Sequence, residues 1–92
     1  MAEQIARKIR VYGRVQGVFF RQWAVNHARA LGISGWVRNC PDGSVEAHIS
    51  GEEPAVGQMI EAMHEGPSQA HVEGLTVDNI EPDDVNGFSV KH

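Results

Sequence analysis

The sequence has very little cysteine and no long apolar run. These two absences argue against a disulfide-bonded protein and against a membrane-spanning one. Cys40 is the only cysteine among the 92 residues, so no disulfide can form within the chain. A lone thiol suits a reducing compartment. No apolar stretch approaches the roughly 20 residues that a membrane-spanning helix needs, and Met1 to Ala6 lack the apolar core of a signal peptide. These absences predict a soluble, cytoplasmic protein with no membrane partner.

The chain also lacks internal repeats and low-complexity linkers. Its length fits one compact domain and leaves no room for a second. We therefore expect residues 1–92 to form a single domain, with a modest buried fraction and a thin margin of stability.

Acidic residues are nearly absent from the first part of the chain, and basic residues from the second. Residues 1–38 hold seven of the eight Lys and Arg residues and one acid, a net charge of +6; residues 39–92 hold one base and eleven acids, a net charge of −10. A small anion would be drawn to the first part, and the second would repel long nucleic acid. Mutual attraction of the two parts explains the asymmetry equally well.

Metal-ligand patterns are missing too. The five histidines show neither the spacing of a metal site nor a cluster with cysteine or acids. We therefore interpret them as scattered surface or half-buried side chains and expect neither a metal nor another cofactor. They are His27, His48, His64, His71 and His92.

Clear periodicities are present in the first half. Apolar and polar residues alternate over residues 9–15, which predicts a strand with one buried face. The spacing then becomes helical and predicts a helix over about 21–31, closed by Gly32 in a left-handed conformation. Two strands follow, over 34–39 and 44–49, joined as a hairpin by the tight turn Pro41-Asp42-Gly43.

The second half continues with a helix from about Pro54 to Gly66. Val72 to Val77 predicts a fourth strand, and its parity slips in a way that a bulge near Glu73-Gly74 would explain. Asp78 to Asn86 is expected to be an acidic loop, followed by a short strand at Phe88 to Val90.

This order of elements predicts an α+β fold of the ferredoxin-like kind. Two right-handed βαβ units share one antiparallel four-stranded sheet, and both helices cover the same face. The short C-terminal strand is additional. With only one face covered, alternation along the strands is expected.

The segment from Gly13 to Arg21 has the properties of an anion site. It joins a predicted strand to a predicted helix, where backbone amides lack partners and the helix dipole is positive. Gly17 can adopt the positive φ that curls such amides into a nest, and the planar guanidinium of Arg21 matches two phosphate oxygens. Strand-to-helix turns with glycine are, however, mostly structural, and Arg21 could instead pair with Asp42 or Glu46.

Two segments of the chain resemble the acylphosphatase family. Gly13 to Arg21 fills every fixed position of the pattern Gly-x-Val-Gln-Gly-Val-x-Phe-Arg, and Gly35 to Glu46 resembles the second conserved segment of that family. The likeness covers nearly the whole chain, from about Arg7 to Val90. Acylphosphatase-like domains also occur inside larger carbamoyl-transfer maturation proteins, but we expect this chain to be a stand-alone domain.

The resemblance implies hydrolysis of an acyl phosphate to a carboxylate and inorganic phosphate. Arg21 and backbone N–H groups can stabilise the charge of this reaction without a metal ion. The resemblance assigns phosphate binding to Arg21 and orientation of the attacking water to Asn39. It also implies a backbone cradle for the phosphate formed by Gln16, Gly17, Val18, Phe19 and Phe20.

Chemical reasoning agrees with these roles. The amide of Asn39 can both donate to and accept from a water, but it is no useful base. We therefore expect a phosphate oxygen of the substrate to take the proton of the water.

Other side chains are weaker candidates. Asp42 is explained by the turn, and Cys40 should point away from the site because neighbouring strand residues face opposite ways. Trp23 could line the site or the surface.

A non-catalytic anion-binding, regulatory or RNA-binding domain of the same fold is the alternative function. The strand over 44–49 offers Ser44, Glu46 and His48 on its polar side in place of the aromatics that an RNA-recognition sheet needs. We expect a monomer whose partner is a small acyl phosphate and not nucleic acid.

Overall fold

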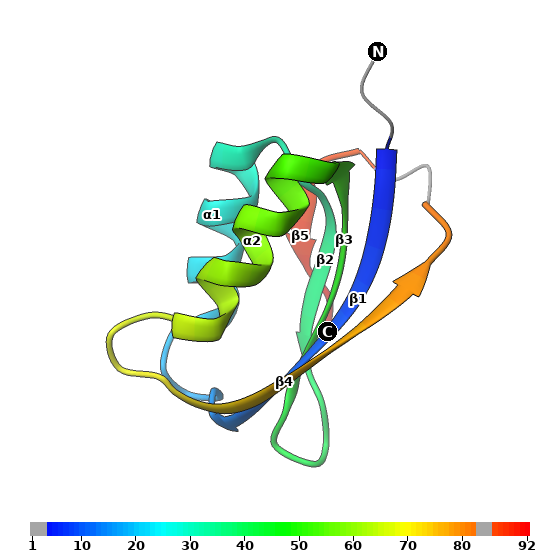
Figure 1. Ribbon diagram of the computed structural model, residues 1–92. Helices are drawn as coiled ribbons and strands as arrows, with labels where there is room; N and C mark the ends of the chain where they lie inside the picture. Colours follow the sequence, from blue (N-terminus) through cyan, green and yellow to red (C-terminus); the bar gives the residue numbers. More distant parts are fainter. Residues whose placement is uncertain (1–3, 83–85) are drawn as a thin grey trace.

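The computed structural model describes residues 4–82 and 86–92, and its elements form two layers (Figure 1). One layer is a twisted sheet, and the other is a pair of helices that covers one of its faces. The elements in chain order are β1 (Gln4–Arg14), α1 (Phe20–Leu31), β2 (Ser34–Asn39), β3 (Val45–Glu52), α2 (Glu53–Glu65), β4 (His71–Ile80) and β5 (Phe88–Val90). No helix in these ranges is long and apolar enough to span a membrane.

The sheet has the strand order β4-β1-β3-β2-β5. The three pairings among β4, β1, β3 and β2 are antiparallel. β5 pairs in parallel with β2, with Gly35 opposite Phe88. The predicted ferredoxin-like α+β fold is therefore confirmed. The short C-terminal strand extends the sheet beyond β2, so the described sheet has five strands, one of them parallel.

The register explains the alternation along the strands. Ile9 of β1 lies opposite Ala47 of β3 and Val77 of β4, so residues of one parity share the face beneath the helices. Most of the apolar residues on this face are fully buried, and they pack with Phe20 and Met59 from the two helices. The other face carries polar and charged residues and has no helix over it (Figure 1).

The bulge predicted in the fourth strand is confirmed. Tyr12 of β1 lies opposite Gly74 and Gly13 lies opposite Val72, so Glu73 between them has no partner residue. The extra residue shifts the parity of β4, as expected for a β-bulge.

The predicted acidic loop from Asp78 to Asn86 was wrong at its start. β4 continues to Ile80, because β1 begins as early as Gln4 and offers a longer edge for pairing. Lys8 lies opposite Asp78 and Ala6 opposite Ile80. Residues 83–85 of the predicted loop lie outside the described residues.

Smaller differences occur at element ends. β1 ends at Arg14, so Val15 belongs to the following loop, and α1 begins one residue earlier than expected, at Phe20. Gly32 closes α1 with φ 71°, which confirms the predicted left-handed cap.

Candidate active site

The loop between β1 and α1 exposes backbone at the N-terminus of a helix. Val15 and Val18 are buried and anchor the loop to the core. Gly17 and Phe19 have positive φ, at 73° and 64°, and Phe19 is the only non-glycine residue of that kind in the described ranges. No side chain caps the N-terminus of α1, and its first turn holds no acid. Its amides are therefore free to bind an anion.

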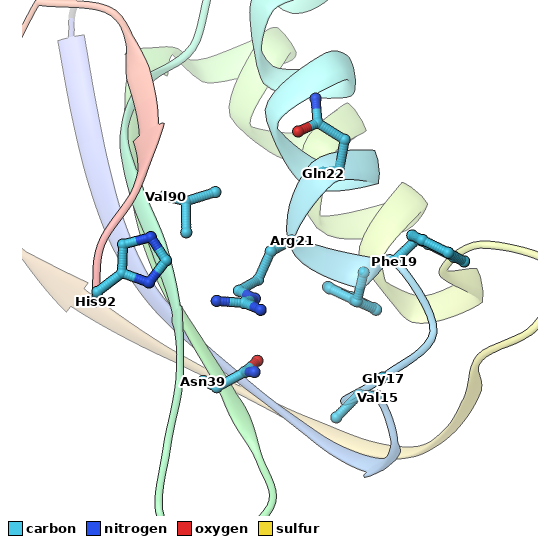
Figure 2. A pocket seen from close by; sticks show the side chains of 9 residues that line it. Val15, Gly17, Phe19, Arg21, Gln22, Asn39, Val90 and His92 are labelled. Atoms are coloured by element: carbon cyan, nitrogen blue, oxygen red, sulfur yellow. The ribbon is translucent and has the colours of Figure 1, made fainter.

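Arg21 is the second residue of α1, and its guanidinium points across the site toward Asn39 (Figure 2). Within residues 4–82 and 86–92 it makes no ion pair and no side-chain hydrogen bond. The alternative that Arg21 pairs with Asp42 or Glu46 was therefore wrong.

Both of these acids bind other arginines on the open face of the sheet. Glu46 Oε1 accepts from Arg38 Nε at 3.0 Å and lies 2.7 Å from Arg38 Nη2, and Glu46 Oε2 lies 3.3 Å from Arg10 Nη2. Asp42 lies 3.7 Å from Arg10. Burial raises the pKa of Glu46, but the hydrogen bond and charge of Arg38, with those of Arg10, outweigh it and leave that pKa below its ordinary value. Both acids are therefore paired with Arg10 or Arg38 and not with Arg21.

Asp42 also has the turn role expected from the sequence. Its Oδ1 accepts hydrogen bonds from the backbone N–H and the hydroxyl of Ser44, at 2.9 and 2.6 Å. These bonds, with the charge of Arg10, hold the pKa of Asp42 below its ordinary value.

Asn39 is the last residue of β2 and shares its parity with buried Val37. Its side chain therefore lies on the helix-covered face, and Figure 2 shows its amide facing the guanidinium of Arg21. The next residue, Cys40, is 7% exposed and does not line the cavity between them.

A cavity of about 430 Å³ lies between the loop, α1 and the ends of β2 and β5 (Figure 2). It brings together Arg21 and Asn39 with three of the five predicted cradle residues. The residues that line it are Val15, Gly17, Phe19, Phe20, Arg21, Gln22, Asn39, Val90 and His92.

The other two cradle residues, Gln16 and Val18, do not line this cavity. Val18 is 4% exposed, and the side chain of Gln16 turns toward the β2–β3 hairpin. Trp23 also lies outside the cavity, with its ring 5.2 Å from that of Phe20 and 4.3 Å from that of His27.

Sequence reasoning missed Gln22, Val90 and His92 as lining residues. Gln22 follows Arg21 in the predicted helix, so its proximity could have been found. Val90 and His92 reach the site only because β5 pairs alongside β2, and no local pattern indicates that pairing. In the part of the chain that the structure describes, no group of three or more His, Cys, Asp or Glu side chains could hold a metal ion.

The fold and this cavity define a class of protein: a small α+β domain with an uncapped helix N-terminus beside an arginine that has no partner among the described residues and an asparagine that faces it. A family model for acylphosphatase matches residues 7–90. The chain belongs to the acylphosphatase family. Its relatives are named acylphosphatases, which are hydrolases that act on acid anhydrides.

Individual relatives agree with this assignment. An acylphosphatase from Anaeromyxobacter dehalogenans is 47% identical over 92 residues, which cover 99% of each chain. The crystal structure of acylphosphatase from Bacillus subtilis matches with a TM-score of 0.93 at 32% identity, covering 96% of this chain and 99% of that one. An acylphosphatase from Coxiella burnetii matches with a TM-score of 0.92 at 35% identity, covering 96% and 93%.

Proposed function

We propose that this protein hydrolyses acyl phosphates as a single domain and without a metal ion. Arg21 and the backbone of residues 16–20 hold the phosphate, and Asn39 orients the attacking water. The observation that carries the proposal is the guanidinium of Arg21, which has no partner among the described residues and faces Asn39 beside an uncapped helix N-terminus (Figure 2).

Phosphate binding follows from charge and geometry. A guanidinium offers two parallel N–H donors to two phosphate oxygens, and the free amides at the start of α1 add donors and the positive end of the helix dipole. Because no acid among residues 4–82 and 86–92 pairs with Arg21, its charge is available to the substrate. The same groups stabilise the negative charge that phosphoryl transfer spreads over the equatorial oxygens.

The chemical step needs positioning more than acid–base catalysis. The oxygen of the water held by Asn39 forms a bond to phosphorus while the bond from phosphorus to the acyl oxygen breaks. The electron pair of that bond leaves on the acyl oxygen as a carboxylate, a stable leaving group that needs no general acid. The proton of the water passes to a phosphate oxygen.

The proposal also includes a cytoplasmic monomer that does not bind nucleic acid. On the open face of the sheet, the ring of Trp36 is already stacked on His48 at 4.1 Å, and Lys91 Nζ lies 4.7 Å from its centroid. The ring of Trp36 is therefore largely covered, which leaves a base little room to stack on it. Size-exclusion chromatography tests the monomer.

The activity is tested by benzoyl phosphate hydrolysis in excess EDTA. We expect turnover by the wild type, and a loss of at least about 100-fold in kcat/KM for Arg21→Ala and for Asn39→Ala, because each removes a positioning or charge-stabilising group. Arg29→Ala and Asn79→Ala change exposed residues outside the cavity and serve as matched controls.

Each outcome bears on one part of the proposal. Full activity of Asn39→Ala contradicts the water-orienting role. A wild type whose turnover is abolished by EDTA contradicts the metal-free mechanism. A wild type that binds phosphate without hydrolysing the substrate favours a non-catalytic anion-binding domain.

A further inference from the structure

His92 lines the cavity on the side of β5, across from α1. Its position follows from the pairing of β5 with β2, in which Val90 lies opposite Val37. The backbone N–H of Lys91 also donates to the carbonyl oxygen of Val37 at 2.9 Å, which fixes the chain just before His92. Because side chains alternate along extended backbone, His92 lies with Val90 on the helix-covered face. Lys91 lies on the open face, with its Nζ 4.7 Å from the ring centroid of Trp36.

The imidazole of His92 and the guanidinium of Arg21 extend toward each other across the cavity (Figure 2). His92 is exposed, and its side chain has no hydrogen bond, ion pair or ring contact with another of residues 4–82 and 86–92. It is also absent from the hydrophobic core and from the residues packed against it. The ring is therefore available to a ligand in the cavity.

The charge that can develop in this cavity has one sign. Among the residues that line it, Arg21 and His92 alone have ionisable side chains, and the lining contributes no acid. The nearest charged side chain on β2, that of Arg38, lies on the open face and pairs with Glu46. Arginine stays charged at all ordinary pH values, whereas a histidine side chain gains its charge between about pH 8 and pH 5. Once His92 is protonated, two cations on opposite walls favour a doubly charged anion between them.

We infer that His92 is a second cationic side chain for the phosphate group, and that the site binds a tetrahedral dianion more tightly once this histidine is protonated. The inference rests on the proposed function, because it adds a contact to the same phosphate site. A protonated imidazole donates a charge-assisted hydrogen bond to a phosphate oxygen on the side away from Arg21. The neutral ring lacks the charge, so this part of the attraction is lost as the pH rises.

The experiment uses sulfate as the probe, because sulfate is tetrahedral and stays doubly charged over this pH range, whereas phosphate titrates within it. Calorimetric titration at low ionic strength gives the Kd of sulfate for the wild type, His92→Gln and His64→Gln. His64 is exposed on α2, outside the cavity, and its variant is the matched control. The change at His92 affects only the side chain, so any charge on the main chain at that residue is the same in both proteins.

Between about pH 8 and pH 5.5, the Kd should fall about two- to fivefold more in the wild type and in His64→Gln than in His92→Gln. His92→Lys keeps a charge at both pH values, so it should bind sulfate tightly at both and lose the extra pH dependence. The difference should shrink in about 1 M sodium chloride, because salt screens exposed charges. The kcat/KM for benzoyl phosphate should show the same difference in pH dependence.

Equal pH dependence in the wild type and His92→Gln overturns the inference. So does weaker binding in His92→Gln by the same factor at both pH values, because the ring would then act on the shape of the cavity and not through its charge. A wild type that binds no sulfate at either pH overturns the inference together with the phosphate site. A wild type that shows the expected sulfate binding but does not hydrolyse benzoyl phosphate is a different failure, that of the proposed function.

Discussion

The side-chain amide of Gln16 donates a hydrogen bond of 2.8 Å to the carbonyl oxygen of Ser44. The same nitrogen also donates to the carbonyl oxygen of Cys40 at 2.9 Å. These bonds tie the loop before α1 to the hairpin after β2, next to Asn39. The two sides of the cavity, one carrying the proposed backbone cradle and the other the asparagine, are therefore fixed relative to each other.

Replacement of Gln16 by leucine should loosen this connection. We expect the free energy of unfolding to fall by about 1–3 kcal/mol, because two carbonyl acceptors lose a donor, and kcat to fall more than the loss of folded protein explains. Urea denaturation and benzoyl phosphate turnover measure the two effects. Gln58→Leu, an exposed change on α2, is the control. Wild-type turnover by a folded Gln16→Leu protein would show that the bonds do not position the site.

Stability should depend on pH through Glu46 and Asp42. The pKa of each carboxyl is lowered in the folded protein, Glu46 chiefly by Arg38 and Arg10 against the effect of burial, and Asp42 chiefly by Ser44. A carboxyl with a lowered pKa stabilises the fold above its ordinary pKa and loses this contribution as the pH falls through the lowered value. The urea midpoint should therefore be level near neutral pH and decline below about pH 4.5, the ordinary value for Glu.

Glu46→Gln isolates one of these groups. It removes the negative charge between Arg10 and Arg38, so the protein should be less stable at pH 7 and its midpoint should decline less steeply in acid. Urea titrations at several pH values measure both changes, with the exposed Glu61→Gln on α2 as the matched control. An acid slope identical to that of the wild type would contradict the assignment to Glu46.

Nothing in the fold requires glycine at position 57. It lies exposed within α2, and a Cβ at this position would meet no atom within 4 Å. Gly57→Ala should raise the free energy of unfolding by about 0.5–1 kcal/mol, because alanine loses less conformational freedom in a helix. Gly32→Ala is the matched comparison. Its residue also has open space but a φ of 71°, so this change should lower stability by about 1 kcal/mol. Urea denaturation of both variants gives the two signs.

Local patterns in the sequence were enough to predict most of the helices and strands and half of the site. Alternation, helical spacing, the cap at Gly32 and the turn around Asp42 depend on neighbours only a few residues away. The bulge at Glu73 was visible because it shifts the parity of its own strand. Arg21 was identified for the same reason: its place in the first turn of a helix after a glycine loop is a local property.

Only the tertiary structure decided which distant groups meet. The acids that might have neutralised Arg21 bind Arg10 and Arg38 instead, because strand register places Glu46 opposite both of those arginines. The extra length of β4 and the position of β5 depend on which strand edges are free. The pairing of β5 with β2 brings Val90 and His92 to the cavity. Which strands pair depends on the relative energies of alternative long-range pairings. These energies cannot be read from residues that are close together in the sequence.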